Sequence, residues 1–388
     1  MFNLDIPSIA YTDPWKIPLI ERLSALNYDQ PSVVYYYDFP DNSTFRYRVY
    51  NMIQALKSIN VSATFLSYKD QNYLEDLVDC ADILVVCRAR YTHKLNRAIV
   101  KAKNKGKTVF FDIDDLVFVP SLTHFILDTL DQDLENPKVW DFWFGYIGRQ
   151  FATMELCERV ITTNKYLANM IQKYLRKPVM VIPNFLNNEQ LNISDQIFKQ
   201  KVQRGFSRNK KITLGYFSGT PSHNKDFRLI SDALAELLGK NSQIDLRVVG
   251  FMELRQPMDL FRSRIQFIKL QDFINLQRLI GEVEVNLVPL QNNIFTNCKS
   301  ELKFFEAGVV GTITVASPVY TYAKAIRDGQ NGFLAQDHEW LEKIELAISQ
   351  LPDNYSIIAE RAHQDSIEQF AWYNQVQTIY KTLFDDVS

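Results

Sequence analysis

The segment TNCKSELKFFEAG, residues 296–308, holds two lysines and two glutamates directly after an apolar run that predicts a buried strand. We expect Lys299 and Ser300 in the first turn of the following helix, where free backbone N–H groups suit a phosphate. Lys299, Lys303 and Glu306 have i, i+4, i+7 spacing and would share one helix face. This face either binds a ligand with phosphates at one end and ribose hydroxyls at the other, or is a solvated surface of lysine and glutamate.

A second candidate lies in GYFSGTPSHNKDF, residues 215–227, where a predicted strand ends in a loop with Gly219, Thr220 and Lys225. Small residues let a backbone approach a phosphate closely. The segment contains neither a Walker P-loop nor a G-x-G-x-x-G motif, which argues against a dinucleotide cofactor. The alternative is a plain turn between a strand and a helix.

Three carboxylates cluster where a strand of the first half should end, in FFDIDDLVF. Asp112, Asp114 and Asp115 would be costly to bury without partners, so they must face solvent, a cation, a metal or sugar hydroxyls. One interpretation is that they line a sugar or acceptor site. The others are that they cap a helix or bind a metal, although no histidine cluster supports a metal.

Arginines follow two other predicted strands. Arg46 and Arg48 come after the first strand, and Arg88, Arg90 and His93 come after the third. These arginines either bind an anionic acceptor or balance the carboxylates. His93 either contacts a sugar hydroxyl or simply begins a helix.

The elements that position these residues are short apolar runs that alternate with amphipathic segments. The predicted strands cover residues 32–38, 63–68, 82–87, 108–114, 159–163, 179–184, 211–219, 244–250, 265–269, 284–290 and 312–317. β-Branched runs separated by helices indicate βαβ units around parallel sheets. The expected fold class is α/β, with two doubly wound domains in succession.

The pattern restarts after a polar stretch at residues 186–210, which we interpret as the region of the linker. We therefore assign residues 1–185 to an amino-terminal domain and residues 186–365 to a carboxyl-terminal domain. The aromatic-rich segment 366–388 either completes the second domain or forms a helix that crosses back to the first.

Composition excludes several classes of protein. Of 388 residues, 46% are hydrophobic and 23% charged, which excludes a disordered chain. The net charge of −2 gives no field that would attract nucleic acid. Four scattered cysteines form no C-x-x-C pair, so we expect reduced thiols in a cytoplasmic protein. We expect neither a signal peptide nor a transmembrane helix.

Two basic stretches, residues 93–107 and 198–211, each carry six lysines or arginines. Either stretch touches anionic lipid head groups, or it is a solvated helix face.

Several motifs together resemble the GT-B glycosyltransferases of family 4. These are VIPN at the end of the first half, GYFSGT with a following lysine, and KSELKFFEAGVVGTITVAS followed by IRDGQNGFL. The resemblance covers nearly the whole chain and is greatest from residue 211 to residue 334. FFDIDDLVF resembles a segment of bacterial surface-polysaccharide members, and the Lys-Ser-x-x-Lys-x-x-Glu arrangement resembles rhamnosyltransferase-like members.

The resemblance implies two Rossmann-like domains that face a central cleft. It implies a retaining transfer from a nucleotide-diphosphate sugar to a glycan or lipid-linked glycan, with no metal and no other cofactor. It implies that Glu306 holds the donor ribose and that Lys225 meets the diphosphate, with Lys299, Ser300 and Lys303 around it.

We therefore expect Lys225, Lys303 and Asp114 to be catalytic, and Gly219 and Thr220 to complete the donor site. We expect the acceptor or sugar to be lined by Arg46, Arg90, His93, Asp112 and Asp115. The expected location is the cytoplasm, and peripheral contact with the inner face of the membrane is an alternative within it.

One departure from the family pattern concerns the E-x7-E motif. Its first glutamate, which contacts the donor sugar in the family, falls at Cys298. Three alternatives to a transferase follow: a nucleotide-sugar epimerase of the same fold, a catalytically inactive GT-B subunit, and a nucleotide-dependent dehydrogenase.

Overall fold

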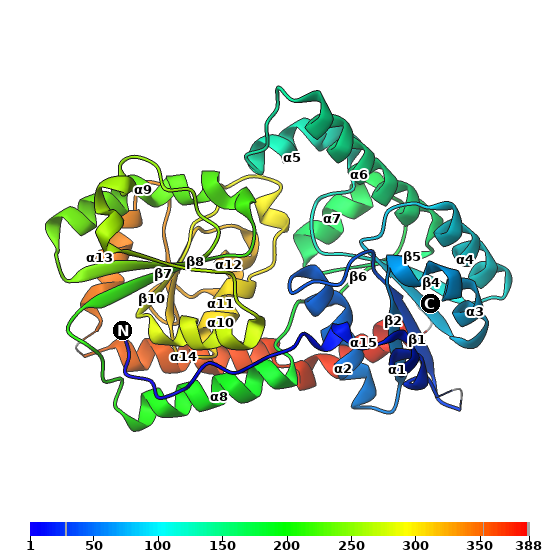
Figure 1. Cartoon of the computed structure of the whole chain (residues 1–388), viewed down its shortest axis with the longest axis horizontal. Coiled ribbons are helices and arrows are strands. Elements are labelled where there is room, and N and C mark those ends of the chain that lie inside the picture. Colours follow the sequence, from blue (N-terminus) through cyan, green and yellow to red (C-terminus); the bar gives the residue numbers. More distant parts are fainter. Residues whose placement is uncertain (28, 352, 386–388) are drawn as a thin grey trace.

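The computed structural model describes residues 1–27, 29–351 and 353–385. It contains two six-stranded sheets that lie side by side, each in its own domain (Figure 1). Every strand pair in both sheets is parallel. The α/β doubly wound prediction is therefore confirmed.

The amino-terminal sheet has the strand order β2-β1-β3-β4-β5-β6. Its strands are β1 Ser32–Tyr36, β2 Ser62–Leu66, β3 Ile83–Cys87, β4 Thr108–Ile113, β5 Arg159–Thr162 and β6 Val179–Val181. β1, β2 and β3 are buried along their whole length. Helices cover both faces of a parallel sheet, and such strands read as continuous apolar runs.

The carboxyl-terminal sheet has the order β12-β11-β10-β7-β8-β9. Its strands are β7 Ile212–Ser218, β8 Ile244–Gly250, β9 Ile265–Ile268, β10 Val285–Val288, β11 Ile313–Ala316 and β12 Phe333–Leu334. β7 and β8 converge at their ends, where a Cβ on Gly250 would lie 1.9 Å from the Ser218 carbonyl oxygen. Gly250 has φ +94°, so this position requires glycine.

The helices of the amino-terminal domain surround its sheet. They are α1 Leu19–Ser24, α2 Asn51–Lys57, α3 Leu74–Cys80, α4 His93–Asn104, α5 Thr123–Thr129, α6 Pro137–Leu156 and α7 Lys165–Tyr174. Side chains cap several of them: the Thr92 hydroxyl accepts from the Leu95 amide at α4, and Asn164 accepts from Leu167 at α7. α5 and α6 project from the domain at the top of Figure 1.

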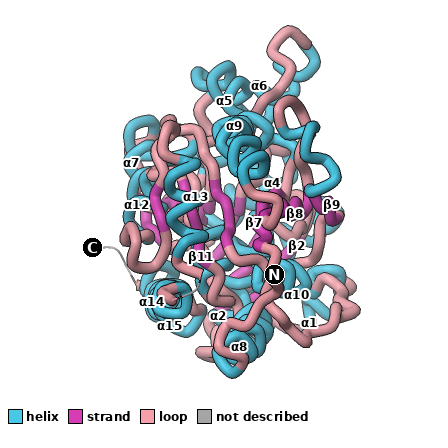
Figure 2. The backbone as a smooth tube through the Cα atoms, turned by 90° about the vertical axis from the view of Figure 1, so that its left-hand side faces the viewer, coloured by secondary structure: helices cyan, strands magenta, loops and turns pink. Residues whose placement is uncertain are grey.

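The remaining helices belong to the carboxyl-terminal domain or connect the two. They are α8 Asn188–Gln203, α9 Asn224–Lys240, α10 Phe273–Glu282, α11 Leu302–Gly308, α12 Tyr320–Ala325, α13 Trp340–Ser349, α14 Tyr355–Phe370 and α15 Trp372–Phe384. α8, α14 and α15 lie together at the bottom of the molecule (Figure 2).

After β1 the chain crosses between the domains twice. α8 begins where the first crossing ends, so the predicted linker region is largely a helix. Ala371 separates α14 from α15, and α15 packs on α2 of the amino-terminal domain. The crossings are tied together, because the Leu186 amide donates to Phe370 and the Trp372 amide donates to Leu186.

The first residues do not follow the predicted division. The Phe2 amide donates to the Glu282 carbonyl, and the Asn3 amide donates to that of Ser207. Phe2 is buried with Leu214 in the core of the carboxyl-terminal domain. The start of the chain therefore packs on the second domain, although residues 1–185 were assigned to the first.

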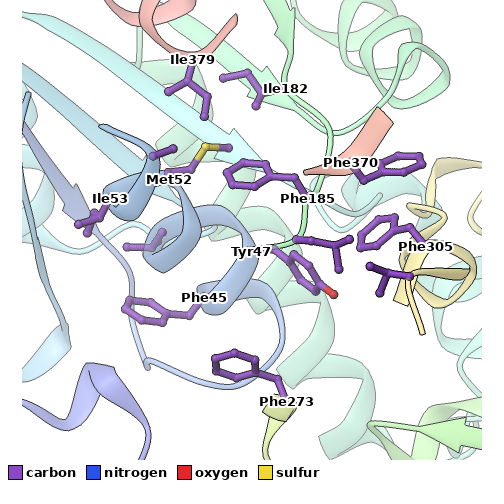
Figure 3. Packing of buried hydrophobic residues seen from close by; sticks show 14 of the residues in the cluster. Phe45, Tyr47, Met52, Ile53, Ile182, Phe185, Phe273, Phe305, Phe370 and Ile379 are labelled. Atoms are coloured by element: carbon purple, nitrogen blue, oxygen red, sulfur yellow. The ribbon is translucent and has the colours of Figure 1, made fainter. Parts of the chain in front are cut away.

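One hydrophobic core continues across both domains at the base of the molecule. In Figure 3 the ring of Tyr47 lies next to that of Phe305, and Phe370 lies beyond. The centroids of Tyr47 and Phe305 are 6.2 Å apart, and those of Phe305 and Phe370 are 4.6 Å apart. This packing fixes α11 of the second domain against the segment after β1. Among the described residues, no helix has the length and apolarity needed to span a bilayer.

Candidate active site between the domains

The loops that follow the strands of the two sheets meet at the domain boundary. Lys299 Nζ lies 3.4 Å from Asp115 Oδ2 across this boundary. Asn164 Nδ2 donates to the Cys298 carbonyl at 2.8 Å. Asn42 Nδ2 donates to the Gln271 carbonyl at 3.2 Å. Ligands of doubly wound sheets bind outside the carboxyl ends of the strands, and this boundary joins two such edges.

Four charged or titratable side chains gather on the second domain at this boundary, and we call them the cationic group: His223, Asp226, Lys299 and Lys303. Lys303 Nζ makes no hydrogen bond or ion pair with any described residue and lies 5.6 Å from the centre of the Tyr216 ring. Burial lowers the pKa of Lys303 to about 8, with Asp226 opposing the shift and Lys299 adding to it. A bound anion would strongly stabilise the charged form of such a buried amine.

His223 is held by Asp226 at the start of α9. His223 Nδ1 lies 2.8 Å from Asp226 Oδ2. Burial lowers the pKa of His223, the hydrogen bond to Asp226 opposes this, and Lys303 and Lys299 lower it further. Asp226 also accepts at Oδ1 from the Gln291 amide at 3.0 Å. The pair therefore orients a neutral imidazole beside two lysines.

Glu306 is 3% exposed and connects the two domains. Its Oε1 accepts from Arg46 Nη2 at 3.0 Å, from Gln190 Nε2 at 3.2 Å and from the Tyr47 hydroxyl. Arg46 was predicted to line the acceptor, but the structure places it, 3% exposed, against the residue predicted to hold the donor ribose. Glu306 Oε2 makes no hydrogen bond with a described residue.

The helix after β10 begins later than expected. α11 starts at Leu302, and Lys299 follows a 3-10 turn in extended conformation. Lys299 and Ser300 therefore lie in the connection before the helix, not in its first turn. The Ser300 hydroxyl is buried and makes no hydrogen bond with a described residue. Burial raises the pKa of Glu301, which precedes α11, to about 7.

Lys225 is turned away from the cationic group. Its Nζ donates to the Asp128 carbonyl and to Asp128 Oδ1, both at 2.6 Å, and so binds α5 of the other domain. Gly219 and Thr220 are exposed in the loop after β7. The structure thus brings His223, which the prediction did not include, beside Lys303, while Lys225 forms a bridge between domains.

The three carboxylates at the end of β4 have different partners. Asp112 is 1% exposed and paired through both oxygens with Arg48, at 2.8 and 2.9 Å. It therefore stabilises the core and does not line an acceptor. Asp114 accepts from Arg88 at 3.0 Å and from the Thr44 hydroxyl at 2.8 Å. Only Asp115 faces the cationic group, through Lys299.

Two further predicted residues lie on the outer part of the amino-terminal domain. Arg90 Nε donates to Asp38 Oδ2 at 2.9 Å. His93 is exposed and begins α4 after the Thr92 cap, which agrees with the alternative that it starts a helix. The structure gives it no contact with the other predicted residues.

Cys298 lies in the amino-terminal core although it belongs to the second domain. It is fully buried in the same cluster as Phe295 and Ile113. Burial raises the pKa of its thiol well above the ordinary value. The side chain at this position therefore lies in the core.

The basic stretches are largely engaged in internal contacts. In residues 93–107 all six cations have partners, including Arg97 with Glu75 and both Lys101 and Lys105 with Asp79. In the second stretch, Lys201 is buried and donates to the Gly311 carbonyl at 3.0 Å. Arg97, Lys101 and Lys105 pair with carboxylates, whereas the other lysines of residues 93–107 and Lys201 bond to neutral oxygens, so contact with anionic lipid stays a prediction.

Sequence reasoning missed three residues of this site: Tyr47, His223 and Asp226. A signal for two of them was present, because His and Asp at i, i+3 at the start of a helix can bond to each other. Tyr47 gave no such signal, since its partner Glu306 is 259 residues away. Within the described ranges, no group of three or more His, Cys, Asp or Glu side chains is placed to hold a metal.

Several solved structures share this architecture. A glycosyltransferase from Rickettsia africae ESF-5 matches with a TM-score of 0.62 and 13% identity, covering 92% of this chain and 100% of that one. HepE from Anabaena, solved with UDP and glucose, matches with a TM-score of 0.59 and 15% identity over 91% and 99%. Sucrose-phosphate synthase from Thermosynechococcus elongatus matches with a TM-score of 0.61 and 13% identity over 92% and 99%.

No curated protein sequence matches the chain. Residues 211–354 match the family model described as Glycosyl transferases group 1. This range includes the whole cationic group and Glu306. The predicted GT-B fold is confirmed, and so is the predicted enzyme class. Residues 211–354 are therefore similar to a glycosyltransferase group 1 domain, and the whole chain has the GT-B fold.

Proposed function

We propose that this protein transfers a sugar from a nucleotide-diphosphate sugar to a glycan or lipid-linked glycan, with retention of anomeric configuration and without a metal. The observation that carries the proposal is the cationic group, in which Lys303 is half-buried and without an anionic partner among the described residues. A buried cation of this kind is costly in the free protein and is stabilised when a diphosphate binds.

The chemistry follows from where charge develops. Transfer breaks the bond between the anomeric carbon and the phosphate oxygen, and negative charge grows on the leaving diphosphate. Lys303 and Lys299 would neutralise that charge, with the His223–Asp226 pair beside them. Positioned donors of this type typically contribute about 10²–10³ in rate each. These groups can take the role of a metal.

Glu306 would hold the donor ribose through Oε2, because its Oε1 is already occupied by Arg46, Tyr47 and Gln190. A carboxylate oxygen accepts hydrogen bonds from ribose hydroxyls. HepE was solved with UDP, which supports UDP as the first nucleotide to test here. The rhamnosyltransferase-like resemblance leaves a deoxyhexose as a candidate sugar.

The acceptor would approach from the amino-terminal domain, beside Asp114 and Asp115. We place the reaction in the cytoplasm, where four free cysteines remain reduced. WaaG, a structural neighbour, is a glycosyltransferase involved in lipopolysaccharide biosynthesis, which supports a role in bacterial surface-polysaccharide synthesis.

The test is a transfer assay with isotopically labelled UDP-sugars and a bacterial glycan extract, with the product anomer read by NMR. We expect transfer with retention that survives EDTA, and a loss of about 10²–10³ in kcat for Lys303→Met. Inversion, a requirement for added metal, or full activity of Lys303→Met would contradict the proposal. Isomerised donor without acceptor would indicate an epimerase.

A further inference from the structure

Four aromatic side chains and one arginine form a continuous series on the amino-terminal domain, which we call the aromatic strip: Tyr68, Phe39, Arg90, Tyr146 and Phe142. The rings of Tyr68 and Phe39 are 5.8 Å apart and inclined by 30°. The guanidinium of Arg90 lies 5.9 Å from the rings of both Phe39 and Tyr146. Tyr146 stacks on Phe142 at 6.2 Å. Each member is therefore a neighbour of the next.

The strip is open to solvent. Phe39 is 55%, Tyr68 49% and Phe142 59% exposed. The first ten residues of α6, which carry Tyr146 and Phe142, include no buried residue. α6 projects from the body at the top of Figure 1. Solvent-exposed aromatic faces in a contiguous series typically mark a binding surface.

The strip begins at the edge of the sheet that faces the donor domain. Phe39 follows β1, Tyr68 follows β2 and Arg90 follows β3, so all three lie at carboxyl ends of parallel strands. Asn42, three residues after Phe39, bonds to Gln271 of the donor domain. The strip therefore runs outward from the domain boundary to α6.

Polar atoms with free hydrogen-bonding capacity lie beside the rings. Asp38 is 8% exposed and pairs with Arg90 through Oδ2, but its Oδ1 makes no hydrogen bond with a described residue. Asn42 Oδ1 is likewise buried and without a partner in the described ranges. Buried polar atoms are normally satisfied, so these acceptors suit hydroxyl donors of a ligand.

We propose that the aromatic strip binds an extended glycan, so that the acceptor is an oligosaccharide or polysaccharide chain and not a monosaccharide. This inference rests on the proposed function, because it names the acceptor of the same reaction. A pyranose ring presents C–H groups on its face and hydroxyls at its edge, which match aromatic rings beside carboxylate and amide acceptors. One sugar covers about one ring, and the strip offers four.

The charges of the strip favour a glycan over a membrane. Arg90 is paired with Asp38, and the segment at the start of α6 carries Asp133, Glu135 and Asp141 against Lys138. Anionic lipid requires a surplus of cations near the aromatic groups, which this surface lacks.

The test is binding of the full chain to a glycan array of mono- to octasaccharides, with affinities then measured for the glycans that bind. We expect hexasaccharides to bind at least about tenfold more tightly than the matching monosaccharide. Phe39→Ala, Tyr68→Ala and Phe142→Ala should each weaken that binding about two- to tenfold. Tyr373→Ala, which removes an equally exposed ring from α15, is the matched control and should change nothing.

Binding of UDP is measured on every variant and should match the unmodified chain. No glycan binding, equal affinity for mono- and hexasaccharides, or loss in Tyr373→Ala equal to that in Phe39→Ala would overturn the inference. Binding of phosphatidylglycerol vesicles that is lost in Phe142→Ala, without glycan binding, would also overturn it. Failure of the proposed function gives a different result, because UDP binding and sugar transfer would then both be absent.

Discussion

Binding of a nucleoside diphosphate should weaken as the pH rises through 8, because Lys303 must be protonated to bind it. Burial lowers the pKa of Lys303 to about 8 in the free protein. A group that is charged in the complex and partly neutral in the free protein must take up a proton on binding. The affinity for the nucleoside diphosphate is therefore highest below pH 8 and falls as the pH rises above 8.

The magnitude follows from this pKa. With a pKa of about 8, about ten in eleven Lys303 amines are protonated at pH 7 and about one in eleven at pH 9. An adjacent anion raises a lysine pKa by about 1–3. The affinity should therefore fall by about five- to tenfold between pH 7 and pH 9, where the phosphate itself, with a second pKa of about 6, no longer titrates.

The assay is isothermal titration calorimetry with UDP at pH 7, 8 and 9, repeated in buffers of different ionisation enthalpy to count protons. Lys303→Arg is the control, since arginine stays charged and should remove the pH dependence. Lys303→Met should bind weakly at every pH. His223 does not interfere, because burial lowers its pKa and leaves it neutral above pH 7.

An affinity that is constant from pH 7 to pH 9 in the unmodified chain would refute this reasoning. So would a dependence that Lys303→Arg retains, because a different group would then be titrating.

Three further outcomes are expected. Asp112→Asn should lower the free energy of unfolding by about 3–5 kcal/mol in denaturant melts and leave UDP affinity intact, because it leaves the fully buried Arg48 without a charged partner. Unchanged stability together with weaker binding of the acceptor would instead assign Asp112 a role in binding. Cys298→Glu should lower the melting temperature far more than Cys298→Ser and should not raise the transfer rate, because it places a carboxylate in the core. A stable and more active variant would show that position 298 faces the donor. Lys303→Met should lower kcat by about 10²–10³ and Lys225→Ala by less than about tenfold, since Lys225 binds Asp128; equal losses in steady-state rates would contradict the different placement.

The sheets could be predicted from sequence because buried parallel strands leave a strong local pattern. Eleven of the twelve strands coincide with apolar runs in the sequence. The twelfth, β12, has two residues and leaves no such pattern. Its position depends on pairing with β11, which is a tertiary contact.

The candidate site was predicted in part. Position along the chain shows that a residue follows a strand, but not which partner it meets there. Arg46 follows β1 and Asp112 lies near the end of β4, yet Arg46 bonds to Glu306 across the domains and Asp112 is buried against Arg48. The start of α11 was misplaced by three residues because Lys299 and Cys298 are held by Asp115 and Asn164 of the other domain. Such contacts leave no local periodicity.

The same limit explains Lys225 and His223. His223 lies in the short segment between β7 and α9 and Lys225 is the second residue of α9, and a lysine is the more obvious partner for a phosphate. In the fold, α5 supplies Asp128 to Lys225, while Asp226 turns His223 toward Lys303. Which side chain reaches the cationic group depends on α5, an element of the other domain.

The most direct measurement is the thermal stability of the chain with UDP, GDP, dTDP, CDP, ADP and NAD, each with Mg²⁺ and with EDTA, beside the Lys303→Met variant. A nucleoside diphosphate at 100 times its Kd should add about 2.7 kcal/mol to the apparent stability. The account predicts stabilisation by one nucleoside diphosphate, equal with metal and with chelator, and lost in Lys303→Met. Stabilisation by NAD alone, or by no nucleotide at all, would contradict a donor site at Lys303.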